Sequence, residues 1–344
     1  MESQTLPPST PATKIRTSLF SLAMCDALGA PAEFQVRGTF AHINTLQPNP
    51  NFGLEVGTWT DDTSMALCLA KSLTRNHSPT PIFSLEEQAK LYVSWFRTGY
   101  LSAVGYCFDT GIATRSALTI WEQRPGEALA IIGKTFAVES KCGNGSLMRV
   151  LPIPLAYFRD EGLAMARARE SSTVTHPHEM CQEACALYTL LICRILQWTE
   201  AREYDRRSKQ DLLDMVKGFE YKNGRLRDAL ASGEFVNKPR ERISSSGYVL
   251  HTLEAALWAF FTTRTFEEGA VLVVNLGDDA DTVAAVYGGL AGVWYADVDF
   301  SKDSSPPRTG YWSERVRGWR EGLVKPEVLE EVVGDLLRVN GLEE

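Results

Sequence analysis

Two acidic clusters, Thr60–Thr63 (TDDT) and Gly277–Thr282 (GDDADT), stand far apart in the chain, and each comes directly before a run of small and apolar residues. Such a run, when it opens with several carboxylates, predicts a buried helix whose first turn presents oxygen atoms. Oxygen atoms are the ligands that hard divalent cations such as Mg²⁺ prefer. The two clusters therefore predict a fold in which two helix starts meet around a pair of metal ions.

Helix capping is the simpler explanation of either cluster taken alone. Asp and Thr are common N-cap residues, and the helix dipole stabilises a carboxylate at a helix N-terminus. A cap needs only one such side chain, whereas three oxygen-bearing residues crowd each helix start here. Like charges so close together cost stability unless a cation offsets them. The two clusters together therefore favour a metal site over two caps.

The composition limits the classes of partner. The chain has 344 residues, a net charge of -8 and no long block of Lys or Arg, which argues against nucleic acid as the main partner because phosphate binding needs a basic surface. Its seven cysteines are odd in number and lack the CxxC spacing of metal sites. We therefore expect reduced core thiols in an intracellular protein.

The polar N-terminal stretch and the most apolar stretch of the chain each support a prediction. Residues 1–13 are rich in Pro, Ser and Thr without an apolar segment, which predicts a disordered N-terminal tail and, by default, a cytoplasmic protein. The most apolar stretch, residues 270–296, is interrupted by three aspartates, so we expect a buried core helix and no membrane span.

Helical periodicity dominates the rest of the chain, and convincing strand patterns are almost absent. We predict an all-α fold with one compact multi-helix domain over residues 14–344, in which residues 200–245 form a charged helical excursion at the surface and residues 301–308 a loop. The face of the first predicted helix carries Asp26 inward. The acidic surface and the lack of a coiled-coil heptad favour a monomer. Helices are predicted at about 15–29, 63–73, 85–98, 111–121, 127–132, 161–173, 179–198, 210–219, 248–263, 282–296 and 326–339.

Seven motifs in this order resemble the ADP-ribosylglycohydrolase family, and the likeness runs from about Ile15 to Ala296. The motifs are Asp26-Ala-Leu-Gly-Ala-Pro-Ala-Glu33, Trp59-Thr-Asp-Asp-Thr63, Phe108-Asp-Thr-Gly111, Gly143-Asn-Gly-Ser146 with Met148-Arg149, Thr175-His176, Ser246-Gly-Tyr-Val249 and Gly277-Asp-Asp-Ala-Asp-Thr282. The ordered set is far more specific than any single motif. The resemblance implies an all-α domain with two Mg²⁺ ions, or Mn²⁺, at the bottom of an ADP-ribose cleft.

The resemblance also implies roles for individual residues. The metal ligands would be Thr60, Asp61, Asp62, Asp279, Asp281 and Thr282. The catalytic residues would be Glu33, Asp61 and Asp279, with Glu33 acting on the water or the leaving group. The substrate-binding residues would be Asn144, Gly145, Ser146, Met148, His176, Ser246, Gly247, Tyr248, Val249 and Phe108. Without the resemblance, most of these would be ordinary turn, cap or core residues.

The function implied is a Mg²⁺-dependent hydrolase that cleaves the bond from C1″ of ADP-ribose to an acceptor and releases ADP-ribose. The substrate would be protein-linked or a small molecule, and the GDDADT cluster favours ADP-ribosyl-arginine. Two alternatives stay open at this point: a phosphohydrolase acting on ADP-ribose 1″-phosphate, and a non-catalytic ADP-ribose-binding protein. A protein that only binds has no need of the six metal-ligand candidates together with Glu33.

Overall fold

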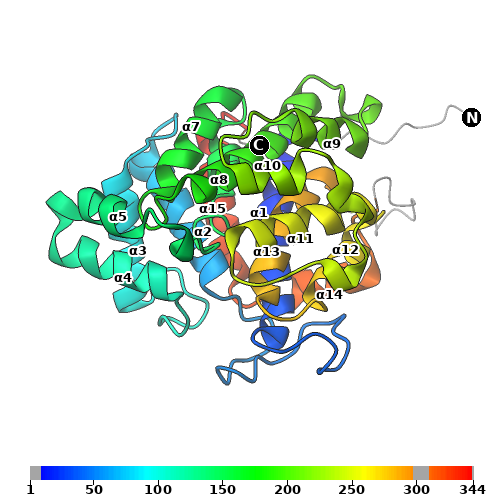
Figure 1. Cartoon of the computed structure of the whole chain (residues 1–344), viewed down its shortest axis with the longest axis horizontal. Helices are drawn as coiled ribbons and strands as arrows, with labels where there is room; N and C mark the ends of the chain where they lie inside the picture. The colour runs from blue at the N-terminus through cyan, green and yellow to red at the C-terminus, as the bar shows by residue number, and fades with distance from the viewer. Residues whose placement is uncertain (1–8, 297–309, 343–344) are drawn as a thin grey trace, which may run out of the picture.

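The structure is a computed structural model that describes residues 9–296 and 310–342. Within these ranges the chain is helical and folds as one domain, as predicted, and extended pairing is limited to two isolated bridges, Asn49–Leu54 and Gly143–Tyr248 (Figure 1). The loop predicted at residues 301–308 lies outside the described residues. No helix of the described ranges combines the length and apolarity that crossing a bilayer requires.

The α-helices of the described residues are α1 (Pro11–Gly29), α2 (Asp61–Leu73), α3 (Leu85–Thr98), α4 (Ile112–Gln123), α5 (Ala128–Phe136), α6 (Pro152–Tyr157), α7 (Glu161–Ser172), α8 (Glu179–Glu200), α9 (Lys209–Gly218), α10 (Gly224–Leu230), α11 (Val249–Thr262), α12 (Phe266–Val274), α13 (Ala280–Tyr295), α14 (Glu314–Glu321) and α15 (Pro326–Val339). Short 3-10 helices are η1 (Ala30–Ala32), η2 (Arg75–His77), η3 (Pro125–Glu127), η4 (Glu139–Lys141), η5 (Tyr204–Arg206), η6 (Glu234–Asn237) and η7 (Arg240–Arg242).

The first helix begins earlier than the sequence predicted. We expected a disordered tail up to residue 13, but α1 already begins at Pro11. The side chain of Thr10 accepts a hydrogen bond from the Thr13 N–H over 3.1 Å, and proline is favoured in the first helical turn because it has no N–H to satisfy there. The predicted tail was too long because it included the N-cap Thr10 and Pro11, which begin the helix.

Helices α1 and α13 form the centre of the domain and run antiparallel (Figure 1). Every residue of α13 is buried, and α1 is buried over most of its length. Small residues let the two backbones approach, and Ser18 Oγ donates to the Gly289 carbonyl over 2.7 Å. One turn earlier in α1, Lys14 Nζ donates to the Val293 carbonyl over 2.8 Å. This pair fixes which ends of the two helices are neighbours.

The remaining helices surround this pair. Helices α2, α8, α11 and α12 pack against α13, and α3, α4 and α5 extend to one side (Figure 1). The apolar stretch 270–296 is two helices rather than the one buried helix we predicted. It breaks at Gly277 and Asp278, whose φ angles are +76° and +55°. This left-handed turn places the second acidic cluster at the start of α13.

Candidate active site

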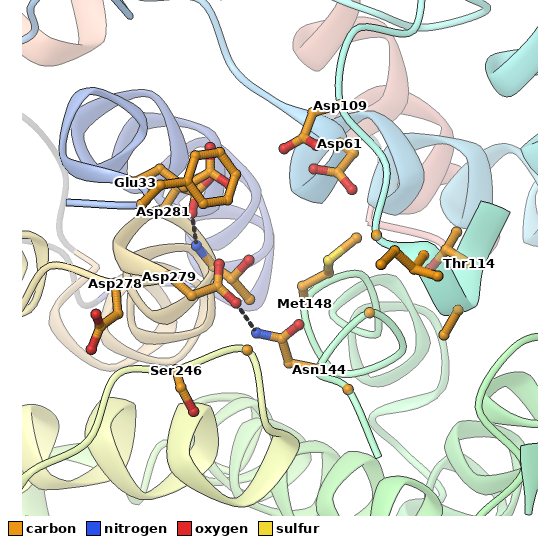
Figure 2. Close-up of a pocket in the computed structure, with 18 of the residues that line it drawn as sticks. Glu33, Asp61, Asp109, Thr114, Asn144, Met148, Ser246, Asp278, Asp279 and Asp281 are labelled. Atoms are coloured by element: carbon orange, nitrogen blue, oxygen red, sulfur yellow. Dashed lines mark hydrogen bonds between the residues drawn. The ribbon is translucent and has the colours of Figure 1, made fainter. Parts of the chain in front are cut away.

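Three chain segments bring carboxylates to one end of the α1–α13 pair (Figure 2). The end of α1 lies so close to the start of α13 that a Cβ added to Gly29 would come within 2.5 Å of the Asp281 Cα. Helix α2 begins beside them, since Thr282 Oγ1 donates to Asp62 Oδ2 over 3.3 Å. The two acidic clusters of the sequence are therefore neighbours in the folded chain.

Asp26 holds the first turn of α2 in place. It lies fully buried on α1, and its Oδ1 accepts hydrogen bonds from the Thr60 N–H at 3.0 Å and the Thr60 hydroxyl at 2.8 Å. Its Oδ2 accepts from the Thr63 N–H at 3.1 Å and the Thr63 hydroxyl at 2.5 Å. Burial raises the pKa of Asp26 to about 6, although these hydrogen bonds act to lower it. Asp26 thus caps α2 from another helix.

Two groups of carboxylates can hold a metal ion. Oxygen atoms of Asp26, Asp62 and Asp281 lie within 4.8 Å of one another, and so do oxygen atoms of Glu33, Asp279 and Asp281. In the described part of the chain, Asp62 Oδ1 and Glu33 Oε2 are buried without a hydrogen-bond partner. Carboxylate oxygens left in this state fit a divalent cation that takes oxygen ligands.

These carboxyl groups are buried close to one another, which raises their pKa values. Burial is the largest cause for Glu33, whose pKa rises to about 11, and Asp109 and Asp61 add to it. Burial followed by neighbouring carboxylates also raises the pKa values of Asp61, Asp62 and Asp281 well above the ordinary value. Without a cation such groups favour the protonated form, and a bound cation favours their ionised form.

A cleft of about 680 Å³ opens above this cluster (Figure 2). Among the residues that the structure describes, six carboxylates and no lysine or arginine line it. Its lining residues are Glu33, Phe34, Asp61, Asp109, Gly111, Ile112, Ala113, Thr114, Gly143, Asn144, Gly145, Met148, His176, Ser246, Gly247, Asp278, Asp279, Asp281 and Thr282.

The glycine-rich loop at residues 143–148 faces the carboxylates across the cleft (Figure 2). Asn144 Nδ2 donates to Asp279 Oδ2 over 2.7 Å and to Thr252 Oγ1 over 2.9 Å, which orients the aspartate. The Asn144 N–H donates to the Gly247 carbonyl over 3.0 Å, so the loop is joined to the segment 246–249. Gly247 leaves room for this contact, because a Cβ there would lie 2.9 Å from Asp279 Oδ2.

His176 forms part of the cleft wall behind this loop. A Cβ added to Gly145 would lie 2.8 Å from His176 Cε1 and 2.9 Å from Thr114 Oγ1, so only glycine fits between them. Burial, followed by the nearby Arg149, lowers the pKa of His176 to about 3. The imidazole is therefore neutral at physiological pH.

The structure places most predicted site residues at the cleft. Lining residues include the predicted catalytic residues and four of the six predicted metal ligands, whereas Thr60 and Asp62 are buried beneath it. The predicted residues that line the cleft are Glu33, Asp61, Asn144, Gly145, Met148, His176, Ser246, Gly247, Asp279, Asp281 and Thr282. Ser246 lines the cleft with its hydroxyl bonded to His251 Nδ1 over 2.7 Å.

Four predicted substrate-binding residues are not part of the lining. The Ser146 hydroxyl accepts a hydrogen bond from the Ser172 hydroxyl in the core, and Val249 is fully buried. Phe108 packs against Phe52, with ring centres 5.3 Å apart. The fourth residue, Tyr248, lies in a second pocket of about 580 Å³, where its hydroxyl bonds to Glu139 over 3.2 Å. Loops that carry the motifs reach the cleft, but a motif does not say which side chain of a loop faces it.

Several lining residues were missed from the sequence. Asp109 lies in the same Phe108–Gly111 motif from which we had selected Phe108, so its carboxylate was the available signal. Phe34 follows Glu33 with a φ of +63° and is 66% exposed at the cleft, and Ile112 at the start of α4 is 81% exposed. Exposed apolar residues of this kind carry no periodic signal, because they belong to turns and helix ends.

Comparison with known proteins finds relatives that match most of the chain. A sequence model described as ADP-ribosylglycohydrolase matches residues 7–343. The chain is 35% identical over 324 residues to the ADP-ribosylarginine hydrolase Tri1 of Pseudomonas putida (strain GB-1), covering 93% of this chain and 78% of that protein. It is also 35% identical over 300 residues to the ADP-ribosylarginine hydrolase Tri1 of Serratia proteamaculans (strain 568), covering 86% and 75%.

A solved structure has the same architecture. It is described as an ADP-ribosylglycohydrolase-related protein complex, and it superposes with a TM-score of 0.73 at 32% identity. The superposition covers 97% of this chain and 99% of that chain. The likeness therefore extends over nearly the whole fold rather than over isolated motifs.

Proposed function

The chain belongs to the ADP-ribosylglycohydrolase family, and on that premise we propose that it is a Mg²⁺-dependent hydrolase that releases ADP-ribose from the guanidinium group of arginine. Hydrolysis of a glycosyl bond is the activity of the family. The cation, the acceptor and the residue roles are the parts that we propose.

The proposed acceptor, arginine, is inferred from the acidic lining of the cleft. Six carboxylates and no lysine or arginine line it among the described residues, and Asp109 stands beside Asp61 (Figure 2). Such a lining attracts a cationic acceptor and disfavours an anionic one. A guanidinium adduct fits this field better than ADP-ribose 1″-phosphate. The relatives from Pseudomonas and Serratia, which carry the name ADP-ribosylarginine hydrolase, support the same acceptor.

The residues that would hold two divalent cations are Thr60, Asp61, Asp62, Asp279, Asp281 and Thr282. Their oxygen donors suit Mg²⁺ and also Mn²⁺. When bound, such cations position ribose hydroxyls and make a bound water more acidic. Asp26 serves better as a support than as a ligand, because both of its oxygens already accept hydrogen bonds from Thr60 and Thr63.

Glu33 is the residue placed to move a proton. Its Oε2 is buried at the cleft without a partner among the described residues, so it can accept a proton from an attacking water. The water oxygen then forms the new bond to C1″ while the C1″–N bond breaks and its electron pair leaves with the guanidine. Asp279, held by Asn144, is positioned to orient the same water.

The glycine-rich loop is the proposed diphosphate site. The N–H groups of Gly145 and Ser146 donate to no atom of the described residues, so they can bind phosphate oxygens. Met148 and His176 would complete this wall, while Ser246 and Gly247 would lie toward the adenosine. A monomeric state and a cytoplasmic location remain predictions.

Release of ADP-ribose tests the proposal directly. Purified protein is offered ADP-ribosyl-arginine, ADP-ribosyl-serine and ADP-ribose 1″-phosphate separately, each with Mg²⁺, Mn²⁺ or EDTA, and free ADP-ribose and phosphate are measured. We expect metal-dependent release of ADP-ribose from the arginine adduct alone. Phosphate release would identify a phosphohydrolase, and binding of ADP-ribose without turnover would identify a non-catalytic protein.

Substitution of the acidic clusters tests the residue roles. Asp61→Asn and Asp281→Asn should abolish turnover and leave the fold intact, since each keeps the size of the side chain and removes its charge. The matched control is Asp228→Asn on the exposed face of α10, which should keep wild-type activity. Full activity in either of the first two variants would refute the proposed ligands.

A further inference from the structure

A buried arginine without an ion pair lies behind the cleft wall. Arg149 is 1% exposed, and no carboxylate pairs with it among the described residues. Its Cζ lies 4.5 Å from the centre of the Tyr92 ring. Its Nη2 donates a hydrogen bond to Thr175 Oγ1 over 2.8 Å. A buried charge without a counter-ion is expensive, so its position calls for a physical reason.

The hydroxyl of Thr175 contacts both Arg149 and His176. Thr175 is fully buried, and its Oγ1 lies 2.8 Å from His176 Nδ1. In the described part of the chain Oγ1 has these two partners only. Because Arg149 can only donate, the Thr175 oxygen accepts from it, and its own proton has one available acceptor, His176 Nδ1.

This hydrogen-bond order determines the tautomer of the imidazole. When Nδ1 accepts, the single ring proton of neutral histidine resides on Nε2. The opposite tautomer would leave the buried Thr175 proton without an acceptor, which is costly. Protonation of both nitrogens is disfavoured by burial and by the positive charge of Arg149, which lower the pKa of His176 to about 3.

The Nε2 side of the ring borders the cleft. His176 is one of the lining residues, and its Nε2 lies 3.4 Å from the positions that a Cβ would take on Gly143 and on Gly145. Nε2 makes no hydrogen bond to the described protein atoms. A ring N–H that meets no protein acceptor is available to a ligand in the cleft.

We propose that Arg149 and Thr175 are positioning residues that hold His176 as the neutral tautomer with its proton on Nε2, so that His176 donates a hydrogen bond to an oxygen of the bound ADP-ribose. The identity of that ligand rests on the proposed function, whereas the tautomer does not. The arrangement provides a fixed donor beside the glycine loop and keeps a second positive charge out of a cleft whose acceptor group is itself cationic.

Nuclear magnetic resonance of the free protein tests the tautomer. In full-length protein with ¹⁵N-labelled histidine, two-bond ¹⁵N–¹H correlations report which ring nitrogen carries the proton, and His176→Gln identifies the signal among the five histidines. We expect protonated Nε2 and bare Nδ1 from about pH 5 to pH 8. A proton on Nδ1, or an imidazolium at pH 6, overturns the proposal whatever the activity of the enzyme.

Variants of Thr175 test the relay itself. Thr175→Val removes the hydroxyl at nearly constant volume, so we expect both tautomers and a roughly three- to tenfold weaker affinity for ADP-ribose by calorimetry, as for the loss of one hydrogen bond. Thr175→Ser restores the hydroxyl and should return both readouts to wild type. An unchanged tautomer and affinity in the valine variant, checked as folded by circular dichroism, overturns the relay. If Thr175→Val does not fold, the tautomer seen in the wild-type and Thr175→Ser spectra still tests the proposal, because a proton on Nδ1 in either protein overturns it.

The ligand part has a separate outcome. Wild-type protein that shows the expected tautomer but binds no ADP-ribose would contradict the proposed function and the donor role while leaving the Arg149–Thr175–His176 relay in place. Wild-type protein that binds ADP-ribose and shows a further downfield Nε2–H proton on binding supports the donor role. Binding without any change at this proton overturns it.

Discussion

At the scale of single residues, one buried carboxylate differs in role from its neighbours. Asp26 accepts hydrogen bonds from both the backbone and the hydroxyl groups of Thr60 and Thr63. Its charge is therefore balanced by donors at the start of α2, whereas Asp62 Oδ1 has no partner in the described part of the chain. The same residue type thus supports the fold at one position and offers a ligand oxygen at another.

Replacement of Asp26 by alanine should destabilise the protein more than it changes the surface of the cleft. The variant leaves the buried N–H groups of Thr60 and Thr63 without acceptors, which we expect to lower the free energy of unfolding by about 3 kcal/mol. Chemical denaturation in excess Mg²⁺ measures this. Asp228→Ala, on an exposed aspartate, is the control and should change stability by less than about 0.5 kcal/mol. Equal stability of the two variants would contradict the capping role.

At the scale of helices, the site depends on how closely α1 and α13 approach. Gly29 has an ordinary helical φ, so its backbone does not need glycine, but its missing Cβ does matter. An added Cβ would meet the Asp281 Cα at 2.5 Å and the Ala280 carbonyl oxygen at 2.8 Å. The position of a proposed metal ligand is thus set by a contact between two helix backbones.

Gly29→Ala should therefore disturb both stability and the site. The clash is with backbone atoms, which cannot rotate away. We therefore expect the free energy of unfolding to fall by at least about 2 kcal/mol and cation binding to weaken. Gly334→Ala, in the interior of α15 where nothing lies within 4 Å of the new Cβ, is the control and should stabilise the fold by up to about 1 kcal/mol. Denaturation and calorimetric cation titration of both variants measure these effects. A Gly29→Ala protein as stable as the control would show that α1 and α13 can move apart without loss of stability.

The sequence predicted helices better than it predicted their ends and side-chain directions. The acidic runs at Asp61 and Asp281 signalled helix starts, because carboxylates next to small apolar residues have a clear physical meaning there. The turn at Asp278 was not predicted, since a non-glycine residue with positive φ depends on its contacts, here the hydrogen bond from its N–H to the Gln35 carbonyl at 2.8 Å. Phe34 and Ile112 reach the cleft only through such tertiary placement.

At the scale of the whole molecule, the fold concentrates negative charge at one end of its central helix pair. The starts of α2 and α13 direct the positive ends of their dipoles at this cluster, which stabilises anions but does not replace a cation. Burial, followed by the neighbouring carboxylates, raises the pKa values of Glu33, Asp61, Asp62 and Asp281. Stability should therefore depend jointly on pH and on divalent cation.

The stabilisation by Mg²⁺ should grow as the pH rises from about 5 to 7. A carboxyl group whose pKa is raised by folding binds more protons folded than unfolded, so its contribution to stability falls as pH rises above the ordinary value, 3.8 for Asp and 4.5 for Glu. For Asp26 that fall continues to about 6, and for Glu33 to about 11. Cation binding favours the ionised forms and should remove this loss.

Thermal unfolding at several pH values, in EDTA and in excess Mg²⁺, measures that dependence. The lowered pKa of His176 gives a slope of opposite sign, but it is common to both series and cancels in their difference. Because ionisation precedes binding, titration of Mg²⁺ at pH 6 should also release protons, seen as a heat that varies with the ionisation enthalpy of the buffer. The Asp281→Asn variant should reduce both effects. A difference between the two series that stays constant with pH would show that these carboxylates do not bind the cation.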